Sequence, residues 1–235
     1  FFGSGMLGFS ELGCYKAAYR FPSINSLISG IFSQAWNMSA IKEKNSRTIA
    51  KFYTDVFSAF SSLIFVIGAG MLLLIKPAIE IFCIEEFHIA YIYTPFLIMA
   101  VVNSCFGTFM GSIYLASQQS VRSLVTCSIG AGLNLILNAI LIPIIGNHGA
   151  AIATFISFSV IFVIRAIDSR KIVRMDPKLP KMVTNTVCLF AMSMIIIFVT
   201  NMVAYYIILS VIFLFVVVIN FRSLVSAINK ILHKN

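Results

Sequence analysis

Apolar runs long enough to cross a membrane recur along the chain, with short polar segments between them. A helix needs about 20 mainly apolar residues to span a bilayer. Spans are expected at 12–41, 53–76, 88–113, 120–144, 149–167, 182–203 and 205–221. The pattern predicts an all-α, polytopic membrane helix bundle of about seven transmembrane helices.

The tightest connection is expected inside the segment NLILNAILIPIIGNHGAAIAT, residues 134–154. One apolar run ends at Pro143, and the next begins directly after the short segment from Gly146 to Gly149. Two membrane-length helices joined by so few residues must reverse direction there. Pro143, Gly146 and Gly149 are therefore predicted to be structural positions.

Composition excludes a soluble protein, because 60% of the residues are hydrophobic and only 11% are charged. A soluble domain has about a quarter of its residues charged. The net charge of +9 does not indicate nucleic-acid binding, because the basic residues gather in the predicted loops between spans. The chain begins with Phe1, without a basic targeting region, so we expect it to be part of a longer protein.

Basic residues divide unequally between the two sides of the predicted bundle. Fourteen of the 17 lie in segments 42–51, 114–122, 165–181 and 222–235, which share one side, and three lie on the other. Cytoplasmic loops carry an excess of lysine and arginine. The first side, with the C-terminus, is therefore predicted to be cytoplasmic.

The first span carries a row of polar residues at helical spacing, which is costly against lipid and favours a water-filled cavity or contact with other helices. Two cations one turn apart, Lys16 and Arg20, could contact an anionic group, or could anchor the helix at the outer membrane surface. The candidate binding residues of this row are Lys16, Arg20, Ser23, Ser26, Gln34 and Asn37.

Other polar positions inside spans allow two interpretations each. Asp55 could couple transport to an ion, or could form an interfacial ion pair with Lys51. Asn134 and Asn138, one turn apart, could join helices or line a cavity. No zinc-protease motif, glycine-rich phosphate loop or catalytic Ser/His/Asp spacing occurs in the sequence, so we expect neither an enzyme nor a metal or other cofactor.

Three segments carry a family resemblance: LGCYKAAYRFPSI (12–24), LNAILIPIIGNHGAAIAT (137–154) and the basic stretch after the fifth span. They resemble the C-terminal lobe of bacterial polysaccharide flippases, the O-antigen and exopolysaccharide repeat-unit exporters. These flippases belong to the multidrug/oligosaccharidyl-lipid/polysaccharide exporter superfamily, whose members have two lobes and work by alternating access.

The resemblance implies four parts in the chain. They are a transporter lobe at 1–168 (the end of helix seven to helix twelve of the MATE-like fold), a basic cytoplasmic linker at 169–181, an extra helix pair at 182–221 and an amphipathic cytoplasmic tail at 222–235.

The implied function is the flipping of polyprenyl-diphosphate-linked oligosaccharide across the bacterial cytoplasmic (inner) membrane, for cell-surface polysaccharide and lipopolysaccharide synthesis. Lys16 and Arg20 would then contact the diphosphate or acidic sugars. Implied partners are this glycan-lipid, membrane lipid, the N-terminal lobe of the same polypeptide and a polysaccharide polymerase, with no nucleic acid.

Three alternatives stay open: a cation-coupled multidrug antiporter of the same superfamily, a lipid II flippase, and a membrane scaffold subunit that does not transport. The positive charges of the first span favour an anionic substrate over cationic drugs. A polyprenyl-lipid glycosyltransferase would need a large loop outside the membrane with catalytic carboxylates, and the longest predicted loop is short and basic.

Overall fold

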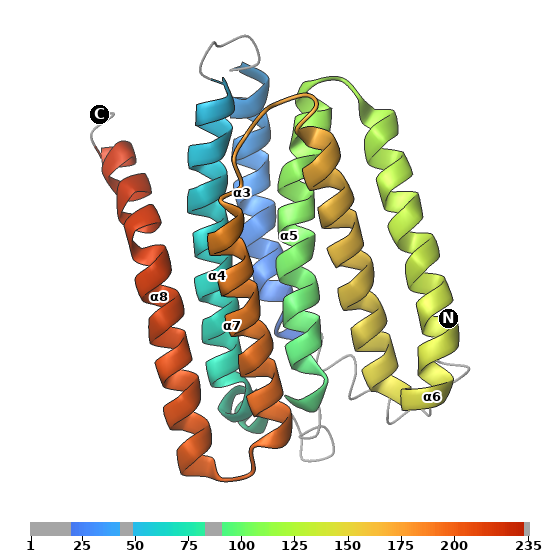
Figure 1. Ribbon diagram of the computed structural model, residues 1–235, viewed down its shortest axis with the longest axis vertical. Coiled ribbons are helices and arrows are strands. Elements are labelled where there is room, and N and C mark those ends of the chain that lie inside the picture. The colour runs from blue at the N-terminus through green and yellow to red at the C-terminus, as the bar shows by residue number, and fades with distance from the viewer. Residues whose placement is uncertain (1–19, 43–48, 83–90, 233–235) are drawn as a thin grey trace.

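The computed structural model describes residues 20–42, 49–82 and 91–232, and this part of the chain consists of helices and short connections, without a strand. Its helices run side by side along the long axis of the molecule (Figure 1). They are α3 (Ser23–Lys42), α4 (Ile49–Phe82), α5 (Thr94–Ala116), α6 (Ser120–Ser169), α7 (Leu179–Phe198) and α8 (Met202–Leu232). The predicted all-α helix bundle is confirmed.

The 50 residues of α6 form two antiparallel arms and not one straight helix. A straight helix of that length would measure about 75 Å, more than twice the thickness of a bilayer core. The backbone leaves helical geometry at Ile145 and Gly146, and Figure 1 shows the two arms meeting at this point. Gly146 has φ +56° and ψ −135°, a conformation that only glycine adopts readily.

Close packing next to this turn explains a second predicted glycine. A Cβ atom at Gly149 would lie 2.5 Å from the carbonyl oxygen of Leu141 on the first arm. The tight reversal is therefore confirmed, and its irregular backbone is confined to two residues.

Helices α4, α5, α7 and α8 and the long element α6 are each long and apolar enough to cross a membrane. Because α6 consists of two arms, these five elements make a multi-pass membrane protein. The less apolar α3 does not meet this criterion over its described length, but it runs beside them in the bundle (Figure 1).

An aromatic core joins α3, α4 and α5. Trp36 of α3 stacks on Phe109 of α5 with ring centroids 5.0 Å apart, and it meets the edge of Tyr53 of α4 at 4.9 Å. The indole N–H of Trp36 donates a 2.7 Å hydrogen bond to the Oγ of Ser112. Since a bilayer provides little hydrophobic drive between helices, such packing and hydrogen bonding hold the bundle together.

Polar contacts divide the bundle into two ends. At one end, called the basic end, the side chain of Arg122 on α6 pairs with Asp168 on the same element, and Lys181 of α7 contacts Ser223 of α8. At the opposite end, the Lys76 ammonium lies 4.0 Å from the ring centre of Tyr205. Loop residues that the sequence assigns to one side therefore share one end of the structure.

The last two helices differ from expectation in two ways. The sequence presents them as nearly featureless, but Asn185 of α7 and Asn220 of α8 are fully buried, and the Nδ2 of Asn220 donates to the Oδ1 of Asn185 at 2.7 Å. In addition, α8 continues to Leu232 and so crosses the boundary predicted at residue 222.

Candidate functional site

Three positions of the polar row predicted in the first span lie on the outside of the bundle. Ser26, Gly30 and Gln34 follow one another at four-residue steps on α3, and all three are exposed. A Cβ atom added to Gly30 would meet nothing within 4 Å. These three residues are called the polar row of α3 below.

The exposed side of α3 is not polar throughout. Leu27 and Ile31 are 66% and 72% exposed and lie beside the polar row on the same side of the helix. The exposed surface therefore has a polar half and an apolar half. A helix at the edge of an aqueous cavity, with hydrocarbon or a second protein unit next to it, has this division.

The remaining predicted binding residues are only partly described. Arg20 is exposed just before α3, and the Oγ of Ser23 donates to the Arg20 carbonyl oxygen. Lys16 lies outside the described residues. Asn37 lies within α3, but the placement of its side chain is not described. The structure thus places Arg20 and Ser23 at one end of the polar row.

Sequence reasoning missed a buried amide on the inner side of α3. Asn25 is fully buried, and neither amide atom of its side chain has a hydrogen-bond partner within the described residues. The Nδ2 of Asn25 lies beside Gly68 of α4, and the Sγ of Cys105 on α5 approaches the Asn25 carbonyl at 3.7 Å. The only sequence signal is the one-turn spacing of Asn25 and Ser29, which does not show that this side of the helix is buried.

A second missed residue is Arg165, which the sequence assigns to a basic loop. This prediction is wrong, because Arg165 is 6% exposed inside the second arm of α6. Its Nη1 donates to the carbonyl oxygen of Gly107 on α5 at 2.9 Å, and its Nε donates to the Oγ1 of Thr126 on the first arm at 2.9 Å.

Further contacts of the Arg165 guanidinium go to neutral groups as well. Its Nη2 reaches the Oγ and the carbonyl oxygen of Ser123 at 3.3 Å and the Sγ of Cys127 at 3.1 Å. A Cβ atom at Gly111 would lie 2.8 Å from Nη1, so the absence of a side chain at Gly111 of α5 leaves room for the guanidinium. The buried guanidinium thus joins α5 to both arms of α6.

One turn after Arg165, the Asp168 carboxylate pairs with basic side chains at the basic end. Arg122 donates to both carboxylate oxygens of Asp168 at 2.8 Å, and the hydroxyl of Tyr114 donates at 3.1 Å. The Lys171 ammonium lies 3.4 Å away. Like Arg165, this network joins α5 and the two arms of α6, so both sets of contacts hold the same three segments together.

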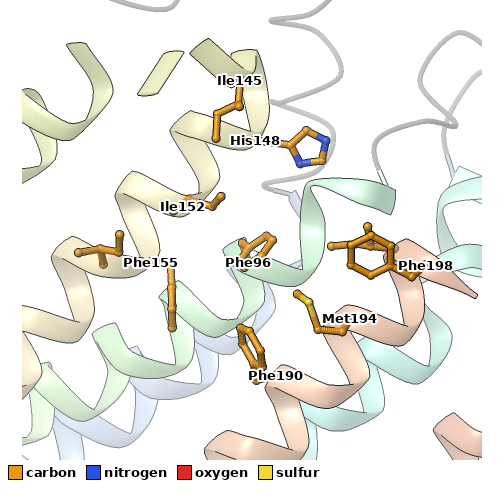
Figure 2. Close-up of a pocket in the computed structure, with 10 residues that line it drawn as sticks. Phe96, Ile145, His148, Ile152, Phe155, Phe190, Met194 and Phe198 are labelled. Atoms are coloured by element: carbon orange, nitrogen blue, oxygen red, sulfur yellow. The ribbon is translucent and has the colours of Figure 1, made fainter. Parts of the chain in front are cut away.

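An apolar groove opens on another face, between α5, the second arm of α6 and α7. Its volume is about 570 Å³, and aromatic and aliphatic side chains form nearly all of its lining. Figure 2 shows Phe96, Phe155 and Phe190 lying along it and His148 at one end. The His148 ring also meets Tyr93 edge-on, with centroids 4.6 Å apart. The groove can hold a hydrocarbon chain and has almost no polar group for a headgroup.

The remaining predicted positions are Asp55 on α4 and the pair Asn134 and Asn138 on α6. Asp55 is half-buried on α4 and has interaction partners, so its role in ion coupling stays a prediction. The Nδ2 of Asn138 donates to the Oδ1 and the carbonyl oxygen of Asn134, both at 2.9 Å. These two amides bond within one helix, which favours neither of the two interpretations open for them.

Comparison of the chain with known protein families, with curated proteins and with solved structures finds no match. The functional interpretation therefore depends on the geometry above and on the sequence resemblance.

Proposed function

We propose that the chain is the C-terminal part of a flippase that moves polyprenyl-diphosphate-linked oligosaccharides from the cytoplasmic to the outer face of a bacterial inner membrane. The observation that carries this proposal is the polar row of α3. Ser26, Gly30 and Gln34 are exposed although they lie within a helix of the membrane bundle. Polar groups in that position need water or polar partners.

A two-lobe transporter supplies such an environment. In that arrangement the polar row lines a cavity between this bundle and an N-terminal lobe, with Arg20 at its mouth. Hydroxyl and amide groups suit the hydroxyls of a sugar chain, and a guanidinium suits a diphosphate. The groove of Figure 2 is suited to part of an isoprenoid chain, because its lining is almost wholly apolar.

The proposal includes an orientation. Lys171, Arg174, Lys178 and Lys181 lie in or next to the connection between α6 and α7 at the basic end, and the charge asymmetry remains when buried Arg165 is removed from the count. Positive residues mark the cytoplasmic side of membrane proteins. The basic end and the C-terminus then face the cytoplasm.

The test uses the full protein in the bacterium that makes it. Changing Lys16→Ala together with Arg20→Ala should abolish surface polysaccharide, because the diphosphate would lose both of the cations proposed to contact it. Immunoblots of membranes confirm insertion of the variant, and phage sensitivity or silver-stained gels report the polysaccharide. Arg170→Ala, which removes an exposed cation next to the end of α6, is the matched control and should leave polysaccharide unchanged.

Normal polysaccharide in the inserted double variant would contradict the role of the two cations. It would leave them as membrane anchors and favour a scaffold subunit.

A further inference from the structure

Two lysines and three serines meet where α4, α7 and α8 approach one another at the basic end. The lysines come from the connection before α7 and from its first turn, and the serines from α4 and α8. Figure 1 shows the start of α7 in the same half of the bundle as the first half of α4 and the later part of α8. This group, Lys178, Lys181, Ser58, Ser62 and Ser223, is called the lysine–serine cluster.

Hydroxyl groups hold both ammonium groups in place. The Nζ of Lys181 donates to the Oγ of Ser62 and to the Oγ of Ser223, both at 2.7 Å. The Nζ of Lys178 donates to the Oγ of Ser58 at 3.2 Å, and the Oγ atoms of Ser58 and Ser223 lie 3.3 Å apart. Ser58 and Ser62 are buried and Lys181 is half-buried, so the cluster is built into the helix junction.

The contacts of the cluster leave unused hydrogen-bond donors. An ammonium group has three N–H donors and no acceptor. These serine contacts use two donors of Lys181 and one of Lys178. The positive charges of Lys181 and Lys178 repel each other, and an anion between them would offset this repulsion.

Two carboxylates lie near the cluster along the chain. The Oδ1 of Asp176 accepts the backbone N–H of Lys178 at 2.9 Å, and Asp55, one turn before Ser58 on α4, also takes part in an interaction. The backbone of Lys178 is left-handed, with φ +51°, at the residue that precedes α7. That strained conformation is sparsely populated by lysine and fixes where its side chain starts.

Two residues of the cluster lie near the ends of apolar stretches. Ser223 lies near the end of the apolar stretch Met202–Ser226 of α8, and Lys181 lies at the start of the apolar helix α7. Basic pockets between transmembrane helices at this level suit anionic headgroups. We propose that the lysine–serine cluster binds the phosphate group of an anionic phospholipid at the basic end of the bundle.

Native mass spectrometry of the full protein in detergent tests the proposal, with dioleoylphosphatidylglycerol as probe, dioleoylphosphatidylcholine as neutral comparison and inorganic phosphate as a separate arm. The protein should bind phosphatidylglycerol in preference to phosphatidylcholine. Each of Lys178→Gln and Lys181→Gln should weaken that binding about fivefold, because a cation near an anionic headgroup contributes about that factor. Arg170→Gln, which removes a positive charge near the end of α6, should not change it.

The variants keep the test decisive. Lys181→Arg should retain binding, and Lys178 is exposed, so Lys178→Gln can be read even if Lys181→Gln does not fold. Competition by inorganic phosphate would extend recognition to the free phosphate group. Equal binding of both lipids, or unchanged phosphatidylglycerol binding when both lysines are replaced by glutamine, would overturn the proposal.

Discussion

Helices α3 and α8 both leave one side uncovered, but the two exposed sides differ in chemistry. Along residues 202–221 of α8 the exposed side chains are apolar or aromatic, including Val211, Leu214 and Val218, which are 61%, 60% and 71% exposed. Along α3 the exposed side includes the polar row of Ser26, Gly30 and Gln34. Both buried sides carry an amide, Asn220 on α8 and Asn25 on α3, so the contrast lies in the exposed sides alone.

The difference shows what each helix is built to meet. An apolar outer side with a polar inner contact is the arrangement of a helix in lipid, where amides hydrogen-bond between helices. Polar side chains on an exposed side, as on α3, favour water next to the helix. Under the proposed function the two helices therefore meet different surroundings, lipid at α8 and a cavity at α3.

A charge placed on each side should separate the two solvents most strongly. Leu214 lies at the middle of the apolar stretch of α8, so Leu214→Asp should cost about 3 kcal/mol, as carboxylates do at the centre of a membrane helix. Gly30→Asp, at an open position of α3, should cost less than about 1 kcal/mol if water is present. The yield and melting temperature of the full protein in nanodiscs report both changes. Equal losses for the two variants would remove the contrast between the helices.

The first arm of α6 offers a smaller test, because it also exposes apolar side chains, such as Leu135 and Ile140. Its position depends on the turn at Gly146. Since φ is +56° there, Gly146→Ala should destabilise the bundle by about 1–3 kcal/mol, the usual cost of such strain.

The matched control for the turn is Gly132→Ala, at a helical position of the same arm with nothing within 4 Å of an added Cβ. It should be neutral or stabilise by about 0.5–1 kcal/mol, because alanine favours a helix over glycine. The free energy of unfolding in mixed detergent checks both variants. A neutral Gly146→Ala would mean that the turn does not set the position of the arm.

The features predictable from the sequence are those that depend on local pattern. The apolar runs gave the helices, and the pair Gly146 and Gly149 gave the reversal, because both signals lie within a few residues of each other. The number of spans also decides on which side each loop lies, and therefore places most of the basic residues at one end.

Features that depend on neighbours distant in sequence could not be predicted. The sequence alone suggests a loop cation at Arg165, but the space beside Gly111 and the carbonyl oxygen of Gly107 on α5 accommodate its buried guanidinium. Likewise, the polar row could be recognised at helical spacing, but its exposure depends on which side of α3 the aromatic core covers. Asn25 was passed over because its burial follows from that same core.

Water access to α3 tests the central claim most directly. Single cysteines at Gln34 and, as the lipid-facing comparison, at Leu214 are introduced into the full protein after its own cysteines have been replaced. A water-soluble maleimide is then applied to membranes opened to expose both faces, so that orientation does not matter. The account predicts rapid labelling at residue 34 and almost none at residue 214, because thiols react as hydrated thiolates. Absence of labelling at both positions, with both proteins inserted and labelled after denaturation, would contradict it.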